Sequence, residues 1–229
     1  MSQPEQLPVD GGTASASVST RPRLRGLSHQ LAFAGALTVA PLLILAAPGV
    51  GPRLIVAVYA FAVVGLFGVS ALYHRGNWEA GGAAFMRRLD HSMIFVMIAA
   101  TYTPIAVFAL PTATAQWVLP AVWGGAVLGI AGRLLWPGAP YPVVALPYLL
   151  VGWVGVVALD EVLNALGVAG FVLIVTGGGL FTVGAVVYAL HRPNPWPHWF
   201  GYHEIFHLFV IGGVVVHYIA VAYFAIPQA

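Results

Sequence analysis

The chain has 229 residues, of which 60% are hydrophobic and only 7% are charged, and its mean hydropathy is +0.89. Soluble domains carry roughly 25% charged residues, so a surface that faces water on all sides is excluded. The net charge of +2 is too small to indicate nucleic-acid binding, and the absence of cysteine excludes disulfides and thiolate metal sites.

Long apolar segments with few charged residues follow one another along the chain. A helix needs roughly 20 apolar residues to cross a hydrocarbon core about 30 Å thick. Proline, glycine and charged residues divide the sequence into seven such segments, at residues 28–47, 54–75, 89–110, 114–135, 142–159, 165–190 and 202–225. The sequence therefore predicts an all-α membrane protein in which residues 21–229 form a seven-transmembrane helix bundle.

The N-terminal segment differs in composition from the rest of the chain. Residues 1–20 are rich in Ser, Gly and Pro and contain no apolar stretch, so they are predicted to be a disordered tail. They lack the short apolar core of a signal peptide, so the first span is expected to remain in the mature protein.

The arginines predict the orientation. All nine basic residues are arginine, and loops on the cytoplasmic side are enriched in basic residues. With the N-terminus inside, only Arg53 lies outside, together with the acidic residues Asp160 and Glu161. We therefore predict a cytoplasmic N-terminus and an external C-terminus.

Ionisable and polar residues gather at three predicted helix ends. The second span ends with Ser70 and His74, the third begins with Asp90, and the seventh begins with His203 and His207. Ionisable groups inside spans are costly and mark functional sites by default. In the predicted topology all three ends lie on the cytoplasmic side, and this convergence is independent support for one shared site.

The residue types and spacing indicate a metal site. Residues four apart share a helix face, so His203 and His207 can direct two imidazoles at one point, and Ser70 can support His74. Catalytic zinc binds three protein ligands and a water, with His nitrogens at about 2.0–2.1 Å. We predict His74, His203 and His207 as ligands, with Asp90 near enough to hold and deprotonate the metal-bound water. Ser70 could instead bond a carbonyl of its own helix.

Other polar residues of these spans have weaker assignments. His29, at the start of the first span, is the one substitute ligand that the sequence offers. His217 lies about 15 Å beyond His207 along the helix, so it cannot share the ion and is either a satisfied interior histidine or a separate polar site. The glycines at 177–179 predict close helix packing.

Two residues beside the predicted site point away from it. His91 lies about 100° from Asp90 around the helix and is expected to meet lipid headgroups or a neighbouring helix. Glu204 lies off the face of the two histidines and is a candidate partner for Arg87 or Arg88.

At these residues the sequence resembles the hemolysin III family, the bacterial branch of the progestin and adipoQ receptor superfamily. The matching stretches are Arg25-Gly26-Leu27-Ser28-His29, Ser70-Ala71-Leu72-Tyr73-His74, Arg88-Leu89-Asp90-His91-Ser92, Thr101-Tyr102-Thr103-Pro104, Arg192-Pro193-Asn194-Pro195-Trp196-Pro197 and His203-Glu204-Ile205-Phe206-His207. The resemblance implies a seven-helix bundle in the bacterial cell membrane with zinc near the cytoplasmic face. It implies the same three histidine ligands, with Asp90 and Ser70 beside them.

Three hypotheses about function follow. The resemblance to eukaryotic receptors and alkaline ceramidases implies a zinc-dependent hydrolase that cleaves an amide or ester of a membrane lipid, with Asp90 as general base and Ser70 orienting the site. The second hypothesis is a non-catalytic sensor or receptor of the membrane state, in which zinc locks the second, third and seventh helices together. The third is a cytolysin, as the family name suggests, although the spans carry no polar stripe that would line a constitutive pore.

Overall fold

The computed structural model describes residues 22–136 and 138–229, so the tail predicted for residues 1–20 lies outside the described residues. Within these ranges the chain forms helices and no β-strand; an isolated bridge pairs Trp196 with Phe200. The prediction of an all-α membrane protein is confirmed.

The helix order follows the predicted segments closely. The α-helices are α1 (Leu27–Ala46), α2 (Val50–Arg75), α3 (Ala80–Ala109), α4 (Thr112–Leu135), α5 (Tyr141–Gly152), α6 (Leu159–Leu190) and α7 (Tyr202–Ala220). A 3₁₀ turn, η1 (Val154–Ala158), joins α5 to α6, and a π-helical turn, η2 (Val221–Ala225), and a 3₁₀ turn, η3 (Ile226–Gln228), follow α7. The third helix begins at Ala80, well before the predicted residue 89.

Six helical stretches of the described chain are long and apolar enough to cross a membrane. The fifth predicted span is not one regular α-helix, because α5 ends at Gly152 and continues as η1. Its apolar residues run on into α6, so that Ala145–Leu190 forms a single 46-residue stretch. The count of seven spans stays a prediction.

Two glycines with positive φ shape the helix ends. Gly167, with φ 67° and ψ 179°, interrupts α6 soon after its start, so the residues before it form a short separate helix. Gly26, with φ 76°, precedes α1, and a Cβ at this position would collide with the Cβ of His74. Glycine adopts positive φ without a steric penalty, and here it also lets the start of α1 pack closely against the end of α2.

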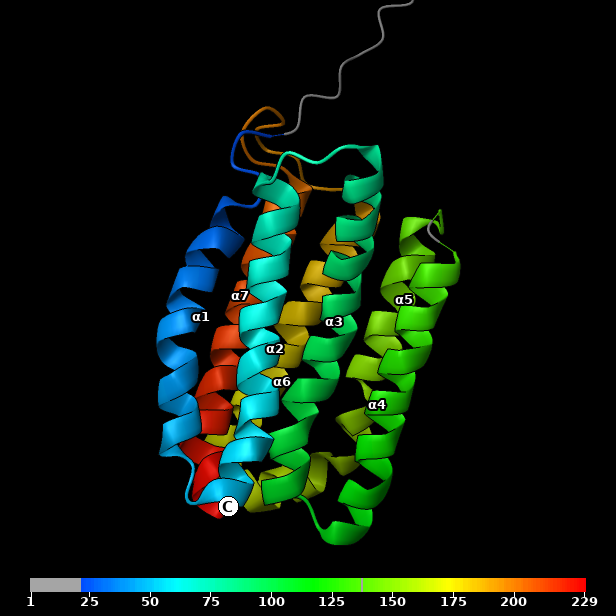
Figure 1. Ribbon diagram of the computed structural model, residues 1–229. Helices are drawn as coiled ribbons and strands as arrows, with labels where there is room; N and C mark the ends of the chain where they lie inside the picture. The colour runs from blue at the N-terminus through cyan, green and yellow to red at the C-terminus, as the bar shows by residue number, and fades with distance from the viewer. Residues whose placement is uncertain (1–21, 137) are drawn as a thin grey trace, which may run out of the picture.

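Consecutive helices pack against one another, and α1 also contacts α7, which closes the bundle. Figure 1 shows that the end of α2, the start of α3, the end of α4 and the start of α7 lie at one end of the bundle, away from the C-terminus. The segment before α1 is held there by two backbone hydrogen bonds, from Arg23 N–H to the His198 carbonyl and from Leu24 N–H to the Trp199 carbonyl.

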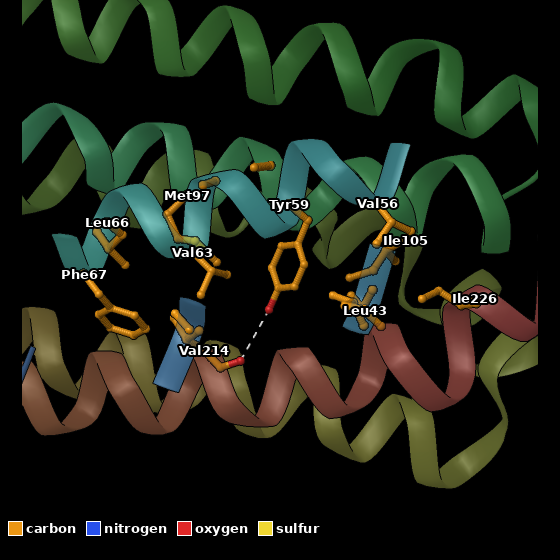
Figure 2. Close-up of a cluster of buried hydrophobic side chains, with 14 of the residues drawn as sticks. Leu43, Val56, Tyr59, Val63, Leu66, Phe67, Met97, Ile105, Val214 and Ile226 are labelled. Atoms are coloured by element: carbon orange, nitrogen blue, oxygen red, sulfur yellow. Dashed lines mark hydrogen bonds between the residues drawn. The ribbon is translucent and has the colours of Figure 1, made fainter. Parts of the chain in front are cut away.

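The largest cluster of buried side chains lies between α1, α2, α3 and α7 (Figure 2). One of its members, Tyr59, is fully buried. A buried tyrosine hydroxyl needs a hydrogen-bond partner, and Tyr59 Oη donates to the Val214 carbonyl at 3.4 Å. This contact joins the middle of α2 to the middle of α7.

The predicted topology can be tested with a reporter fused after Ala229. We expect the fusion to be accessible from outside the cell, because the arginines hold the other end of the bundle in the cytoplasm. The measurement is labelling of a C-terminal tag in intact cells, with a tag before residue 1 as the matched control. Labelling of the N-terminal tag alone would reverse the assignment.

Candidate metal centre

The structure brings together the three histidines that the sequence predicted as ligands. His74 comes from the last turn of α2, and His203 and His207 come from the first two turns of α7. One ligand atom from each ring lies within 4.8 Å of the other two. The Nε2 atoms of His74 and His203 are only 3.1 Å apart. Three nitrogen donors from two helices therefore converge on one point.

These distances fit a small metal ion. Tetrahedral coordination with metal–nitrogen bonds of about 2.0–2.1 Å separates two ligand nitrogens by about 3.3–3.4 Å, close to the separation of His74 and His203. The ring centroids of the three histidines lie 4.6 to 5.1 Å apart. Neutral imidazoles suit zinc, copper, iron and nickel, so the donor set is that of a transition-metal site.

The first turn of α7 is fixed by Glu204. Its Oε2 accepts a hydrogen bond from Gly201 N–H at 2.8 Å, and its Oε1 pairs with Arg25 Nε at 2.6 Å. The predicted pairing with Arg87 or Arg88 is therefore wrong. The reason is the helix order around the bundle, because α1 lies beside α7 and brings Arg25 to the start of that helix. Glu204 thus ties together the segments that aim His203 and His207.

His29 does not supply a fourth nitrogen to the cluster. Its ring stacks on His207 with centroids 3.7 Å apart and planes 7° apart. His29 is absent from the group of three histidines whose ligand atoms cluster. Because it presents a ring face, His29 supports His207 from behind.

Asp90 and Ser70 pair with each other beside the cluster. Asp90 is 8% exposed and Ser70 is buried, and a side-chain hydrogen bond joins them. A carboxylate can only accept, so the Ser70 hydroxyl donates. Ser70 therefore connects α2 to α3 through this hydrogen bond. The Asp90 carboxylate lies outside the group of three histidines.

Two tyrosines that no sequence pattern distinguished lie beside the site. Tyr188 of α6 lies 5.9 Å from the His203 ring and 6.4 Å from the His91 ring. Tyr148 of α5 donates a hydrogen bond to the His91 carbonyl at 3.1 Å. His91 thus faces a neighbouring helix, one of the two expected alternatives. Tyrosines are common in membrane proteins as interfacial and packing residues, so no sequence signal distinguished these two.

An apolar cavity of about 230 Å³ starts beside the cluster. Asp90, His91 and His203 line one part of it, and it follows α3, α5, α6 and α7 past His217 to Val162. His203 and His217 are about 21 Å apart along the axis of α7, at 1.5 Å per residue. The cavity is therefore long enough to hold an extended hydrocarbon chain.

His217 is a polar residue in this apolar cavity, remote from the three histidines. Its Nε2 lies 3.1 Å from the Ile174 carbonyl, which can only accept, so Nε2 carries the hydrogen. Its Nδ1 has no partner among the described residues. A Cβ on Gly177 would collide with this ring, which confirms close packing at that glycine, whereas Gly178 and Gly179 have free space.

Replacing Glu204 with glutamine should destabilise the protein, because Arg25 would lose its partner. Breaking a buried ion pair by removing one member costs on the order of 3 kcal/mol. The measurement is thermal unfolding in detergent, with Glu79→Gln as the matched control, since Glu79 is exposed. Equal unfolding midpoints for the two variants would show that the ion pair does not hold α7.

Comparison with known proteins identifies relatives. The family model described as Haemolysin-III related matches residues 18–218. Hemolysin-3 from Bacillus cereus is 33% identical over 141 residues, which are 62% of this chain and 62% of that protein. A Hemolysin-3 homolog from Bacillus subtilis (strain 168) is 31% identical over 138 residues, which are 60% of this chain and 62% of the relative. The alignments thus span less than two thirds of either relative. The chain belongs to the haemolysin-III-related family and is a multi-pass bacterial membrane protein.

Proposed function

We propose that the protein is a zinc-dependent hydrolase that cleaves an amide or ester bond of a membrane lipid. The observation that carries this proposal is the position of the three clustered histidines beside a long apolar cavity that is also lined by Asp90. A candidate metal site and a carboxylate thus lie beside an apolar cavity.

Zinc is the metal that best matches the donor set. Catalytic zinc sites use three protein ligands and leave one position for water or substrate. Among the described residues, neither His29 nor Asp90 joins the three histidines as a fourth ligand. His203 belongs both to the cluster and to the cavity wall, so a fourth position facing the cavity would be reachable by substrate.

The chain's own residues supply proton transfer and positioning. When bound, zinc would act as a Lewis acid that polarises the substrate carbonyl and makes water nucleophilic at neutral pH. Asp90 would take the proton from the attacking water and return it to the leaving amine or alcohol as the carbonyl–heteroatom bond breaks. Ser70 would orient the Asp90 carboxylate through their hydrogen bond. The apolar cavity would hold the acyl chain and exclude water.

A structural role for zinc is the second candidate, and one observation favours it. The ligands come from α2 and α7, so an ion held by them would lock these two helices together, as expected of a sensor or receptor. The relatives are named for haemolysis. The cavity lined by the described residues is predominantly apolar, which does not favour a water-filled pore.

Removing any one of the three histidines should empty the site. We expect His74→Ala, His203→Ala and His207→Ala each to lose most bound zinc, because two nitrogens form only a weak site. His217→Ala is the matched control and should retain zinc, because His217 lies outside the cluster. The measurement is elemental analysis of protein purified in detergent. Equal zinc in all four variants would refute the ligand assignment.

Replacing Asp90 with asparagine separates the two roles of zinc. If Asp90 is the general base, the variant should keep zinc and lose about 10²–10⁴-fold in turnover. If zinc is structural, the loss of a carboxylate beside the site should lower zinc affinity by about 10–100-fold and reduce thermal stability. The measurement is fatty-acid release from a native lipid extract, combined with zinc analysis. Zinc-replete wild type that releases no fatty acid would leave the hydrolase proposal without support.

A further inference from the structure

Arg133, in the last turn of α4, is the only arginine among the described residues that is buried, with 6% of its surface exposed. An arginine near the end of a transmembrane helix normally extends its guanidinium to the polar interface. Burial of Arg133 is therefore unusual and needs a physical explanation.

No acidic group of the described chain neutralises Arg133. The one ion pair within the described ranges joins Arg25 to Glu204, and Arg133 Nε has no hydrogen-bond partner there. Asp90 is engaged by Ser70. The titratable groups that interact electrostatically with Arg133 are His91 and Tyr148. A neutral imidazole and a neutral phenol supply no negative charge to balance the guanidinium.

The surroundings of Arg133 add positive charge. Arg87 also interacts electrostatically with His91, so the same histidine lies in the field of two guanidinium groups. The carbonyl end of α4 favours a cation in its last turn, but this effect is small beside the cost of burying an unpaired charge. An anion from outside the chain would supply the missing compensation.

A groove of about 330 Å³ between α4 and α5 includes Arg133 in its wall. Leu128, Trp136 and Leu150 also line it, and all three are exposed on the surface of the bundle. Gly132 lies in the same wall, and a Cβ there would meet no atom within 4 Å. The groove therefore combines an apolar surface that faces lipid with one buried cation that forms no ion pair with the described residues.

We propose that this groove binds an anionic phospholipid, with the phosphate on Arg133 and an acyl chain along the apolar wall. A guanidinium matches the geometry of phosphate and can donate two parallel hydrogen bonds to it. Basic pockets between helices on the cytoplasmic side are suited to anionic headgroups, and α4 ends at the predicted cytoplasmic end of the bundle (Figure 1). The site does not depend on hydrolase activity or on a metal.

Native mass spectrometry of the full-length protein, delipidated in neutral detergent, tests this proposal. The probes are phosphatidylglycerol, phosphatidylcholine and oleate, each added alone. We expect phosphatidylglycerol to bind the wild type, and Arg133→Gln to weaken that binding by about ten- to hundredfold, because charge-assisted hydrogen bonds are lost. Arg192→Gln, which removes an exposed arginine, is the matched control and should bind like the wild type.

A second variant blocks the groove and leaves the arginine unchanged. Gly132→Phe directs a ring into open space, so it should fold and lose phosphatidylglycerol. Equal binding of phosphatidylglycerol and phosphatidylcholine by the wild type would overturn the proposal. Binding of oleate without phosphatidylglycerol would also overturn it, because the occupant would then be a fatty carboxylate. Undiminished phosphatidylglycerol binding by both Arg133→Gln and Gly132→Phe would equally contradict it.

Discussion

The contact between the last turn of α2 and the first turns of α7 is the interaction on which the candidate metal centre depends. His74 meets His203 across this contact at 3.1 Å. The Tyr59 hydrogen bond to the Val214 carbonyl holds the same two helices together deeper in the bundle. The ion pair between Arg25 and Glu204 adds α1 to the arrangement. Three histidines can share one ion only while these helices keep this register.

The bilayer explains why so few polar groups define the molecule. Lipid-facing residues are apolar, so each ionisable residue inside the bundle must be paired, hydrogen-bonded or compensated by a ligand. Glu204 is paired and Asp90 is hydrogen-bonded, whereas the three histidines form a cluster of donors and Arg133 forms no ion pair with the described residues. The histidine cluster and Arg133 lie at the same end of the bundle. The cluster is suited to a metal cation, and Arg133 is suited to an anion.

The sequence predicted that His74, His203 and His207 meet. Helical periodicity places His203 and His207 on one face of a helix, and the distribution of arginines places the helix ends on one side of the membrane. The pairing of Glu204 with Arg25 was not predicted, since it depends on α1 lying beside α7. Hydropathy predicted a fifth apolar segment but could not show that α5 gives way to a 3₁₀ turn, or that Gly167 breaks α6. The burial of Arg133 depends on how α4 packs, which the pattern of a single helix does not determine.

X-ray absorption at the zinc edge of the purified wild-type protein tests the central claim most directly, because it reports the metal and its nearest neighbours together. The account predicts about one zinc per chain, with three imidazole nitrogens at about 2.0–2.1 Å and a fourth light atom. Protein that contains no stoichiometric zinc, or zinc whose first shell lacks imidazole, would contradict a metal centre built from His74, His203 and His207.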